Sequence, residues 1–407
     1  MAVYDAIVVG GGVVGAAIAR ELQSSGLQVV LCEKEKEWLT GASSGNTGHL
    51  GSNFYYTRSR APLEAEMTAK AREINPSWLA GQYNVPARKD GLIYLARGEE
   101  EEKALDELLS LAEENRIRTV RRISILELKE LEPGLDCEGV SSAILSEEEY
   151  IVDPWLLSMT HIYGCEVSGV DMKLDCEVQG AEKTGDVWAI QTNQGIIKGK
   201  LVFNCGGNYG DLVEKLGNPQ SVPNFTIKPG KGEYLILSED NPEQRVRRPI
   251  LPVPTKQTAG VYIFKSISGH TVVGPTNIRQ ESRTDRSVSQ DSIKIMMDHV
   301  QSLYPGTKVA SLLGTYAGLR PATEHQDYMV SIDLTRGWIT LGGIRSTGLT
   351  CSLALSQYIC SQIIPGYSPS LVPLLPSPVL TGNRVRFGDK DYLPTHPLSS
   401  LNLFGYM

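Results

Sequence analysis

A glycine-rich stretch near the amino terminus constrains the fold more than any other part of the chain. Residues 6–9 form an apolar run typical of a strand buried on both faces, and a helical pattern begins at Val13 and Val14. Between them, Gly10, Gly12 and Gly15 have the spacing G-x-G-x-x-G. Such glycines permit a tight turn, close approach of the backbone to a diphosphate, and close packing of helix on strand. The stretch therefore predicts a phosphate-binding turn whose phosphates face the helix N-terminus.

An acidic residue after the next apolar run supports this interpretation. Residues 28–33 predict a second strand that ends in Glu33, with Lys34 following it. Glu33 lies near the spacing of roughly 20 residues at which an acid accepts the ribose hydroxyls of a dinucleotide. An acid there favours a free 2′-hydroxyl, so the pattern predicts FAD or NAD rather than NADP. The alternative is an ordinary glycine-rich turn followed by an unrelated acid.

Length and composition exclude several classes of protein. The 407 residues are enough for two domains, and the net charge of −8 without a basic cluster argues against nucleic-acid binding. The most apolar run near the start, residues 6–19, is too short and glycine-rich to cross a membrane, and no basic leader precedes it. The seven cysteines form no C-x-x-C pair, so no metal or iron–sulfur site is expected. We expect a cytoplasmic protein without a transmembrane segment.

Three further polar or glycine-rich stretches are candidates for ligand contact. Residues 40–56 are rich in Gly, Ser and Asn, and their hydroxyls and amides can hold phosphates or a polar ring edge. The alternative is a flexible surface loop. Apolar strands also run into glycines at residues 201–207 and 338–343, and the second is followed by a helix to about residue 363.

The order of the elements predicts the domain organisation. A β-rich block at residues 226–275 separates two α/β parts of the chain. We therefore expect an α/β fold, in which a Rossmann-like dinucleotide-binding domain carries an inserted α+β substrate domain built on a mixed, largely antiparallel sheet. The expected dinucleotide-binding segments are 1–75, 150–212 and 310–364, the substrate-domain segments are 76–149 and 213–309, and 365–407 is a surface tail, in part disordered.

Six motifs in this order resemble those of FAD-dependent oxidoreductases of the D-amino-acid-oxidase type. The most similar branch contains the flavin glycerol-3-phosphate dehydrogenases and L-2-hydroxyglutarate dehydrogenases. The resemblance covers about residues 4–364. The motifs are residues 9–15, 230–235, 251–255, 273–276, 316–323 and 343–350.

The resemblance implies tightly but non-covalently bound FAD. Gly10, Gly12 and Gly15, with Val13 and Val14, would take the diphosphate, and Glu33, with Lys34 beside it, the ribose. The positions that would hold the ribityl chain, the adenine and the flavin ring are Ser43, Ser44, Asn46, Val178, Cys205, Gly206, Gly207, Gly343, Arg345, Gly348, Leu349 and Thr350.

Flavin-dependent oxidation also needs a base and a fixed positive charge that holds an anionic substrate. Arg320 matches an arginine that contacts the substrate anion. Arg345 suits the same role, serves the flavin, or pairs with a carboxylate. His49 is a candidate base or a loop histidine bonded to backbone. The remaining candidates are Tyr55 and Tyr262, which close the site or belong to the core, and Lys231, which faces phosphate or solvent.

The loop after Asn46 departs from the family pattern. Many relatives carry a histidine five positions on, where this chain has Gly51, while His49 stands two positions earlier and Asn53 replaces a usual glycine. Either an insertion shifts the loop or the histidine is missing.

The resemblance leads to one expected function and two alternatives. We expect an FAD-dependent dehydrogenase or oxidase of a small anionic 2-hydroxy compound, with glycerol 3-phosphate as first choice. The enzymatic alternative is oxidation of L-2-hydroxyglutarate or of a secondary amino acid resembling hydroxyproline. The alternative of another class is a non-catalytic flavin-binding scaffold. The electron acceptor stays open among oxygen, a quinone and another protein.

Overall fold

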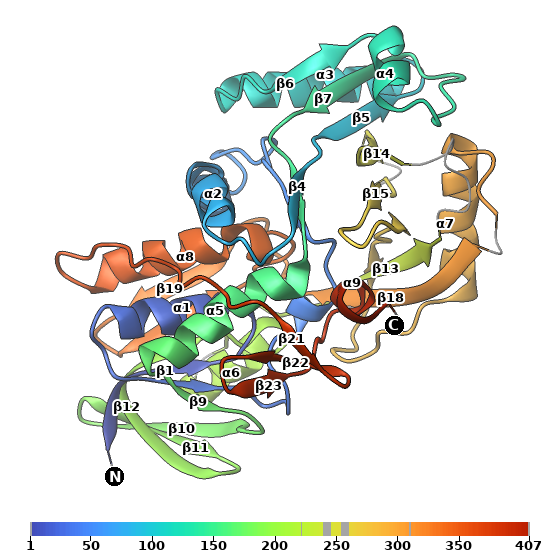
Figure 1. Cartoon of the computed structure of the whole chain (residues 1–407). Coiled ribbons are helices and arrows are strands. Elements are labelled where there is room, and N and C mark those ends of the chain that lie inside the picture. Colours follow the sequence, from blue (N-terminus) through green and yellow to red (C-terminus); the bar gives the residue numbers. More distant parts are fainter. Residues whose placement is uncertain (1, 221, 239–245, 254–259, 309–310, 406–407) are drawn as a thin grey trace.

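Two large β-sheets organise the chain (Figure 1). The computed structural model describes residues 2–220, 222–238, 246–253, 260–308 and 311–405. The first sheet has eight strands in the order β10-β11-β12-β1-β2-β9, with β20 paired to β12 and β19 to β20. Its strands are β1 (Val3–Val9), β2 (Val29–Cys32), β9 (Asp171–Lys173), β10 (Val178–Thr184), β11 (Val187–Thr192), β12 (Gly195–Asn204), β19 (Met329–Asp333) and β20 (Trp338–Gly342).

At the centre of the first sheet, β1 is buried on both faces from Ala6 to Val9, as the apolar run at residues 6–9 predicts. Ala6 and Val8 belong to one core, whereas Ile7 and Val9 belong to another with Val213. Helix α1 (Val13–Ser24) contacts both α5 (Pro154–Ser168) and α8 (Gly348–Ile363), and α6 (Gly210–Gly217) packs on β10 and β20. The parallel pairs β1–β2 and β1–β12 bring the glycine turn after β1 beside the ends of both neighbouring strands.

The second sheet has nine strands and is largely antiparallel, with one parallel pair, β5–β14. The order is β17-β13-β16-β15-β14-β5-β7-β6, and β18 pairs with β13. Its strands are β5 (Leu92–Ala96), β6 (Val120–Ile123), β7 (Ser142–Ser146), β13 (Gly230–Leu237), β14 (Ile250–Pro252), β15 (Ile263–Lys265), β16 (Thr271–Val273), β17 (Ile278–Arg279) and β18 (Leu312–Arg320). Because β18 belongs to this sheet, the chain returns to the first sheet after Arg320 and not at residue 310.

The remaining helices and a small sheet fill the space around the two large sheets. Helices α3 (Glu99–Glu114), α4 (Ile125–Leu131) and α7 (Gln290–Leu303) pack on the second sheet, and β3 (His49–Leu50), β8 (Tyr150–Val152) and β4 (Ala87–Lys89) form the small sheet. Helix α2 (Pro62–Ala80) continues through Pro76, although a proline inside a helix removes one backbone donor. Among the described residues, no helix has both the length and the apolar character needed to cross a membrane.

The expectation of a surface tail at residues 365–407 is wrong for its described part, residues 365–405, which we call the C-terminal module. It contains β21 (Val379–Thr381), β22 (Arg384–Phe387), β23 (Lys390–Tyr392) and α9 (Pro397–Phe404). Leu375, Val385 and Phe387 are fully buried in the core that contains Trp155 of α5. Strands of three or four residues are too short to show a clear alternation of apolar and polar residues, so the sequence pattern does not predict them.

Candidate functional site

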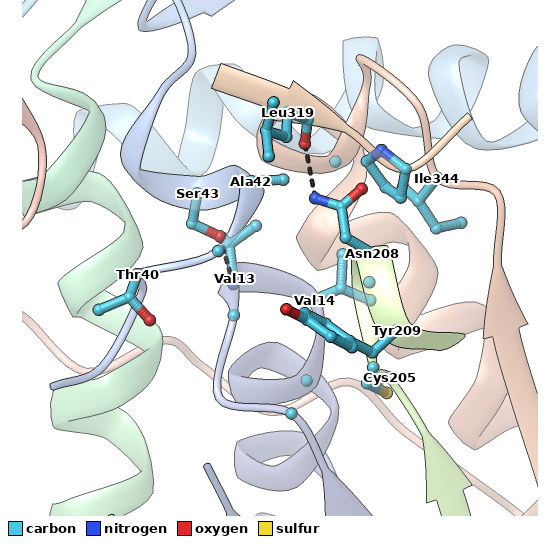
Figure 2. A pocket seen from close by; sticks show the side chains of 18 of the residues that line it. Val13, Val14, Thr40, Ala42, Ser43, Cys205, Asn208, Tyr209, Leu319 and Ile344 are labelled. Carbon is cyan, nitrogen blue, oxygen red and sulfur yellow. Dashed lines mark hydrogen bonds between the residues drawn. The ribbon is translucent and has the colours of Figure 1, made fainter. Parts of the chain in front are cut away.

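A cavity of about 750 Å³ lies between the two sheets (Figure 2). Eighteen of the residues predicted from the sequence line it: Gly10, Gly12, Val13, Val14, Gly15, Glu33, Lys34, Ser43, Asn46, Val178, Cys205, Gly206, Gly207, Arg320, Gly343, Arg345, Gly348 and Leu349. Its volume is in the range of small-molecule and cofactor sites. The cavity thus brings together segments from the beginning, middle and end of the chain.

The glycine turn has the geometry that a diphosphate requires. Gly10 has a φ of +107°, and a Cβ there would lie 2.4 Å from the backbone oxygen of Cys205. A Cβ on Gly15 would lie 2.0 Å from the Gly10 oxygen, so both positions exclude a side chain. A Cβ on Gly12 would meet only Ser43 Oγ, at 3.4 Å. The turn is therefore closed toward the protein and open beside Gly12, and it fits a dinucleotide cofactor.

Glu33 is fixed at the cavity wall by two backbone amides. Oε2 accepts from Gly11 N at 2.7 Å and Oε1 accepts from Glu35 N at 2.9 Å. Burial raises the pKa of the Glu33 carboxyl. Each carboxylate oxygen has a further lone pair that can accept a hydrogen bond from a ligand hydroxyl. The neighbouring Lys34 ammonium lies 4.2 Å from the centre of the Tyr209 ring and 2.7 Å from Glu35 Oε1.

Residues 40–48, which we call the polar loop, are held in place. Asn46 Nδ2 donates to Ser43 O at 2.9 Å, and Asn46 Oδ1 accepts from Gly48 N at 2.8 Å. Ser43 Oγ accepts from Val13 N at 3.0 Å, so the loop contacts the start of α1 (Figure 2). A Cβ on Gly45 would lie only 2.5 Å from Gly318 Cα. The loop therefore packs tightly against β18, and the alternative of a flexible surface loop does not hold.

His396 of the C-terminal module also holds the polar loop, although no sequence pattern predicts this contact. Its Nε2 lies 3.0 Å from the backbone oxygen of Asn46, and its Nδ1 accepts from Leu398 N at 3.2 Å. Tyr316 donates to the same Asn46 oxygen at 3.1 Å. Burial lowers the pKa of His396 to about 3. The imidazole is therefore neutral, and Asn46 N also donates to its Nε2 at 3.1 Å.

Arg320 stands at the end of β18, on the cavity wall. No carboxylate pairs with it in the part of the chain that the structure describes. A Cβ on Gly232 of the neighbouring strand would lie 2.8 Å from Arg320 Nη2, so the guanidinium occupies space that a side chain would take. Asn208 Nδ2 donates to Leu319 O at 2.9 Å and ties the turn after β12 to this strand end (Figure 2). The result is an uncompensated positive charge at a fixed place.

Arg345 forms an ion pair with a carboxylate, which is one of the three roles that the sequence allows for it. Its Nη2 contacts Glu64 Oε2, and Thr347 donates to Glu64 Oε1 at 2.8 Å. Glu64 lies in the first turn of α2 and is fully buried, and burial raises its pKa. Arg345 still lines the cavity, but its charge is compensated. Sequence reasoning missed Glu64, because one acid in an amphipathic helix has no distinguishing pattern.

His49, Tyr55 and Tyr262 do not line the cavity. His49 Nε2 lies 2.9 Å from Glu149 Oε2, in contact but without the alignment of a hydrogen bond, and its ring stacks on Tyr262 with centroids 5.5 Å apart. Glu149 accepts from Ser52 N at 2.8 Å and is 2 % exposed. Its position at the end of the acidic run 147–149 suggests a solvated surface, so the sequence concealed it.

The backbone near His49 explains one departure from the family pattern. Asn53, at the place of a usual glycine, has a φ of +50°, in the left-handed region that asparagine tolerates better than most residues. Tyr55 then packs against Tyr56 with ring centroids 4.9 Å apart. Burial, with the Glu64 charge, raises the pKa of Tyr56 to about 12, and its hydroxyl interacts with Ser346 on the cavity wall. The aromatic residues thus connect the His49 region with the cavity.

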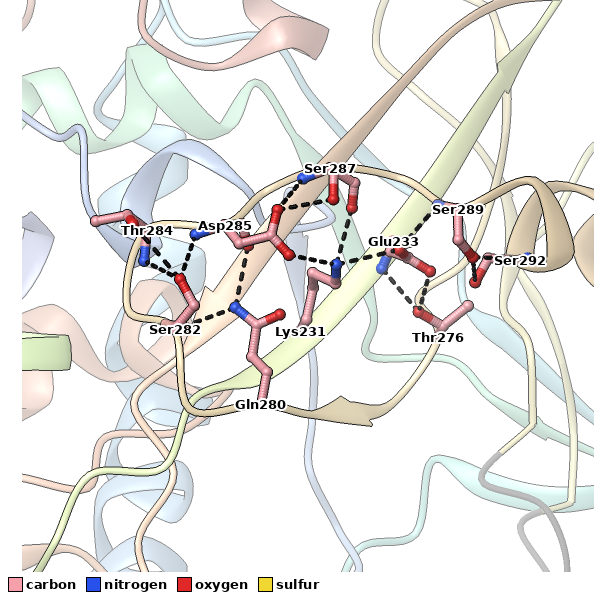
Figure 3. Close-up of polar contacts among 10 residues, drawn as sticks. All are labelled: Lys231, Glu233, Thr276, Gln280, Ser282, Thr284, Asp285, Ser287, Ser289 and Ser292. Carbon is pink, nitrogen blue, oxygen red and sulfur yellow. Dashed lines mark hydrogen bonds and ion pairs between the residues drawn. The ribbon is translucent and has the colours of Figure 1, made fainter.

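Lys231 does not face the cavity or the solvent, contrary to both sequence interpretations (Figure 3). Its Nζ lies 3.1 Å from Asp285 Oδ2 and 3.5 Å from Glu233 Oε1, and it donates to Ser287 O at 3.0 Å. Its side chain is 9 % exposed. These contacts use all its donors within the protein, so a role for Lys231 in binding substrate has no support.

Two predicted cofactor residues lie behind the cavity wall. Ser44 Oγ donates to Thr40 O at 2.7 Å and accepts from Arg286. Thr350 is buried, and its backbone oxygen accepts from Asn75 Nδ2 at 2.9 Å. Arg283 and Arg286 also line the cavity. The sequence does not identify them as site residues, because the polar stretch around them has the pattern of an ordinary loop.

Known proteins with similar sequences and folds were found for most of the chain. The profile of the family described as "FAD dependent oxidoreductase" matches residues 5–362. Glycerol 3-phosphate dehydrogenase of Caloramator mitchellensis is 26% identical over 88% of this chain and 73% of its own length. The mitochondrial L-2-hydroxyglutarate dehydrogenase of Arabidopsis thaliana is 24% identical over 88% of this chain and 83% of its own length. Among solved structures, reduced L-alpha-glycerophosphate oxidase from Mycoplasma pneumoniae with FAD bound superposes with a TM-score of 0.81, at 23% identity, covering 88% of this chain and 93% of that one.

Proposed function

This chain belongs to the FAD-dependent oxidoreductase family, and from that premise we propose that it oxidises a small anionic 2-hydroxy compound, with glycerol 3-phosphate as first choice. The observation that carries the proposal is Arg320, a guanidinium on the cavity wall without a carboxylate partner among the described residues. Such a group binds a phosphate or carboxylate through two parallel hydrogen bonds. A neutral alcohol would leave this charge without an anion.

The cavity residues support a specific arrangement of the cofactor. We assign the diphosphate to the glycine turn and the start of α1, and the adenosine ribose to Glu33. Val178 and the turn at Gly206 and Gly207 suit the adenine part. Ser43 and Asn46 suit the ribityl chain, and Gly343, Arg345, Gly348 and Leu349 suit the flavin ring, whereas Ser44 and Thr350 act behind the wall.

The proposed chemistry divides the work between cofactor and protein. Bound FAD would supply the hydride acceptor for the substrate carbon. Arg320 holds the substrate anion and so orients that carbon. His49 does not line the cavity, so it can act as the base only on a substrate that extends past the wall toward the His49–Glu149 pair, whose Nε2 and Oε2 lie 2.9 Å apart. Tyr262 stacks on the His49 ring, whereas Tyr55 packs on Phe54 beside this pair.

The two sheets support a proposed division of labour. We assign FAD binding to a Rossmann-like first domain from segments 1–75, 150–212 and 321–364, and substrate binding to an inserted domain from 76–149, 213–309 and β18. The seven cysteines are all free, which suits the reducing cytoplasm that we propose as its location. The electron acceptor stays open among oxygen, a quinone and another protein.

Turnover of paired substrates with an artificial dye as electron acceptor tests the proposal. We expect glycerol 3-phosphate to give a kcat/KM at least roughly 30-fold above that of glycerol, because glycerol lacks the anion that Arg320 binds. A higher kcat/KM with L-2-hydroxyglutarate or hydroxyproline would assign the enzyme to that alternative substrate. Equal rates with glycerol and glycerol 3-phosphate would contradict the role of Arg320. No turnover with any compound would favour the flavin-binding scaffold.

A further inference from the structure

We propose that Arg286 binds the diphosphate of the cofactor, so that the loop after β17 of the second sheet completes the phosphate site beside the first sheet. This inference needs FAD but no particular substrate. Arg286 lines the cavity, donating through Nη1 to Ser44 Oγ at 2.8 Å and through Nη2 to Thr40 O at 2.6 Å. Ser43, adjacent to Ser44, accepts from Val13 N at the start of α1. The guanidinium is thus one residue away from the group that contacts the phosphate-binding helix end.

Among the described residues, the groups that accept hydrogen bonds from Arg286 are all neutral. Its hydrogen bonds reach only a hydroxyl and the backbone oxygens of Thr40 and Gly41. No carboxylate pairs with it within the described ranges, and Glu35, whose charge acts on it, is paired with Lys34 at 2.7 Å. Arg286 is exposed, and the partial desolvation imposed by its surroundings still lowers the pKa of its guanidinium. An anion in the cavity would supply the charge partner that the described residues do not.

Arg283 provides the contrast within the same loop. Its guanidinium lies 2.6 Å from Asp211 Oδ1 and donates to Asp211 Oδ2 at 2.8 Å. It also donates to the backbone oxygen of Asn208. Arg283 therefore fastens the loop to the α6 region, and its charge is already matched. Of these two arginines, only Arg286 retains an uncompensated charge.

The loop that carries Arg286 is held rigidly on both sides (Figure 3). Asp285 Oδ1 accepts from Ser287 N at 3.0 Å and from Ser287 Oγ at 2.7 Å, and Oδ2 contacts Lys231. The Ser287 bonds, together with Lys231, lower the pKa of Asp285 to about 2. Asp285 N donates in turn to Ser282 Oγ at 3.0 Å. The buried Lys231 thus anchors the residue next to Arg286, which reduces the ordering cost of ligand binding.

The experiment measures dissociation constants of FAD, ADP and riboflavin for the apoprotein. We expect Arg286→Gln to weaken FAD and ADP alike, by roughly 10- to 100-fold, and to leave riboflavin unchanged because riboflavin has no phosphate. Arg286→Lys should recover part of the loss. Arg279→Gln is the matched control, because Arg279 is an exposed arginine of β17 that does not line the cavity, and it should change each constant less than about 2-fold.

Two outcomes would overturn the proposal. Weaker binding of FAD with unchanged binding of ADP would mean that Arg286 acts on the flavin part. Unchanged binding of both would mean that it is not a ligand. If Arg286→Gln does not fold, Asp285→Asn tests the proposal instead, because it weakens the contact with Lys231 that anchors the loop. This variant should raise the dissociation constants of FAD and ADP by the same factor, about 3-fold. An unchanged dissociation constant of ADP in that variant would equally contradict the proposal.

Discussion

The imidazole Nε2 of His396 lies 3.0 Å from the backbone oxygen of Asn46, although the two residues are 350 positions apart in the sequence. His396 is also the N-cap of α9, because its Nδ1 accepts from Leu398 N. One neutral side chain therefore joins the C-terminal module to the polar loop on the cavity wall. Protonation of Nδ1 would remove the cap and place a charge in a fully buried position.

This arrangement predicts a pH-dependent stability. The pKa of His396 is about 3 in the folded protein, below the value of about 6.5 expected after unfolding. The unfolded chain then binds more protons between these values, so the contribution is fully present above about pH 6.5 and is lost as the pH falls toward 3, by up to about 1.4 kcal/mol per unit. His396→Gln should be less stable at neutral pH, by about 1–3 kcal/mol, with a shallower loss toward acid in denaturant titrations.

His325→Gln is the matched control for that titration, because His325 has a side chain that is 45% exposed. It should follow the wild-type pH curve. Parallel curves for wild type and His396→Gln would show that His396 does not carry the acid sensitivity.

Gly12→Val should abolish FAD binding and leave the fold intact. A Cβ at this position meets only Ser43 Oγ, at 3.4 Å, so the added methyl groups enter the space assigned to the diphosphate. We expect the purified variant to be colourless, with a circular dichroism spectrum and a Tm close to those of the wild-type apoprotein. Full flavin occupancy would show that the diphosphate binds elsewhere.

Arg320→Ala should weaken catalysis on the anionic substrate. Loss of a bidentate, charge-assisted contact costs on the order of 2–4 kcal/mol, which is roughly 30- to 1000-fold in kcat/KM. Arg320→Lys should recover only part, because an ammonium lacks the planar fork. Flavin content, measured by absorbance after denaturation, should not change. Wild-type turnover, or loss of FAD together with activity, would make Arg320 a structural residue.

Gly232→Ala tests the placement of Arg320 without removing its charge. The added Cβ would lie 2.8 Å from Arg320 Nη2 and 2.8 Å from Pro275 Cβ, so the guanidinium must move. We expect a rise in KM for the substrate of roughly 10-fold or more, with FAD affinity retained. Gly81→Ala, at the end of α2 with no protein atom closer than 3.5 Å, is the control and should keep the wild-type KM. An unchanged KM in Gly232→Ala would contradict the assigned position.

The sequence predicts the parts of the fold and site that depend on local pattern. The glycine turn, the strands at residues 6–9 and 28–33 and the approach of Gly206 and Gly343 to the cavity all follow from spacing within short segments. Their side-chain requirements are set by backbone sterics, as at Gly10 with its positive φ. These features can therefore be predicted from the sequence without knowledge of the tertiary contacts.

The features that escaped prediction are pairings between distant segments. Glu64 with Arg345, Glu149 with His49, and His396 with Asn46 each join residues whose own neighbourhoods look ordinary. Lys231 was misassigned for the same reason, since Asp285 lies in another part of the chain. A family motif indicates the position of a residue in a strand. It does not indicate the oppositely charged residue that pairs with it, because that residue comes from a distant segment of the chain.

The most direct test of the proposed reaction is anaerobic mixing of the FAD-loaded protein with glycerol 3-phosphate while the visible absorbance of the flavin is recorded. The account predicts bleaching in a single turnover with glycerol 3-phosphate, and little or none with glycerol at the same concentration. An oxidised flavin spectrum that persists with glycerol 3-phosphate, L-2-hydroxyglutarate and hydroxyproline would contradict the oxidation of a small anionic 2-hydroxy compound.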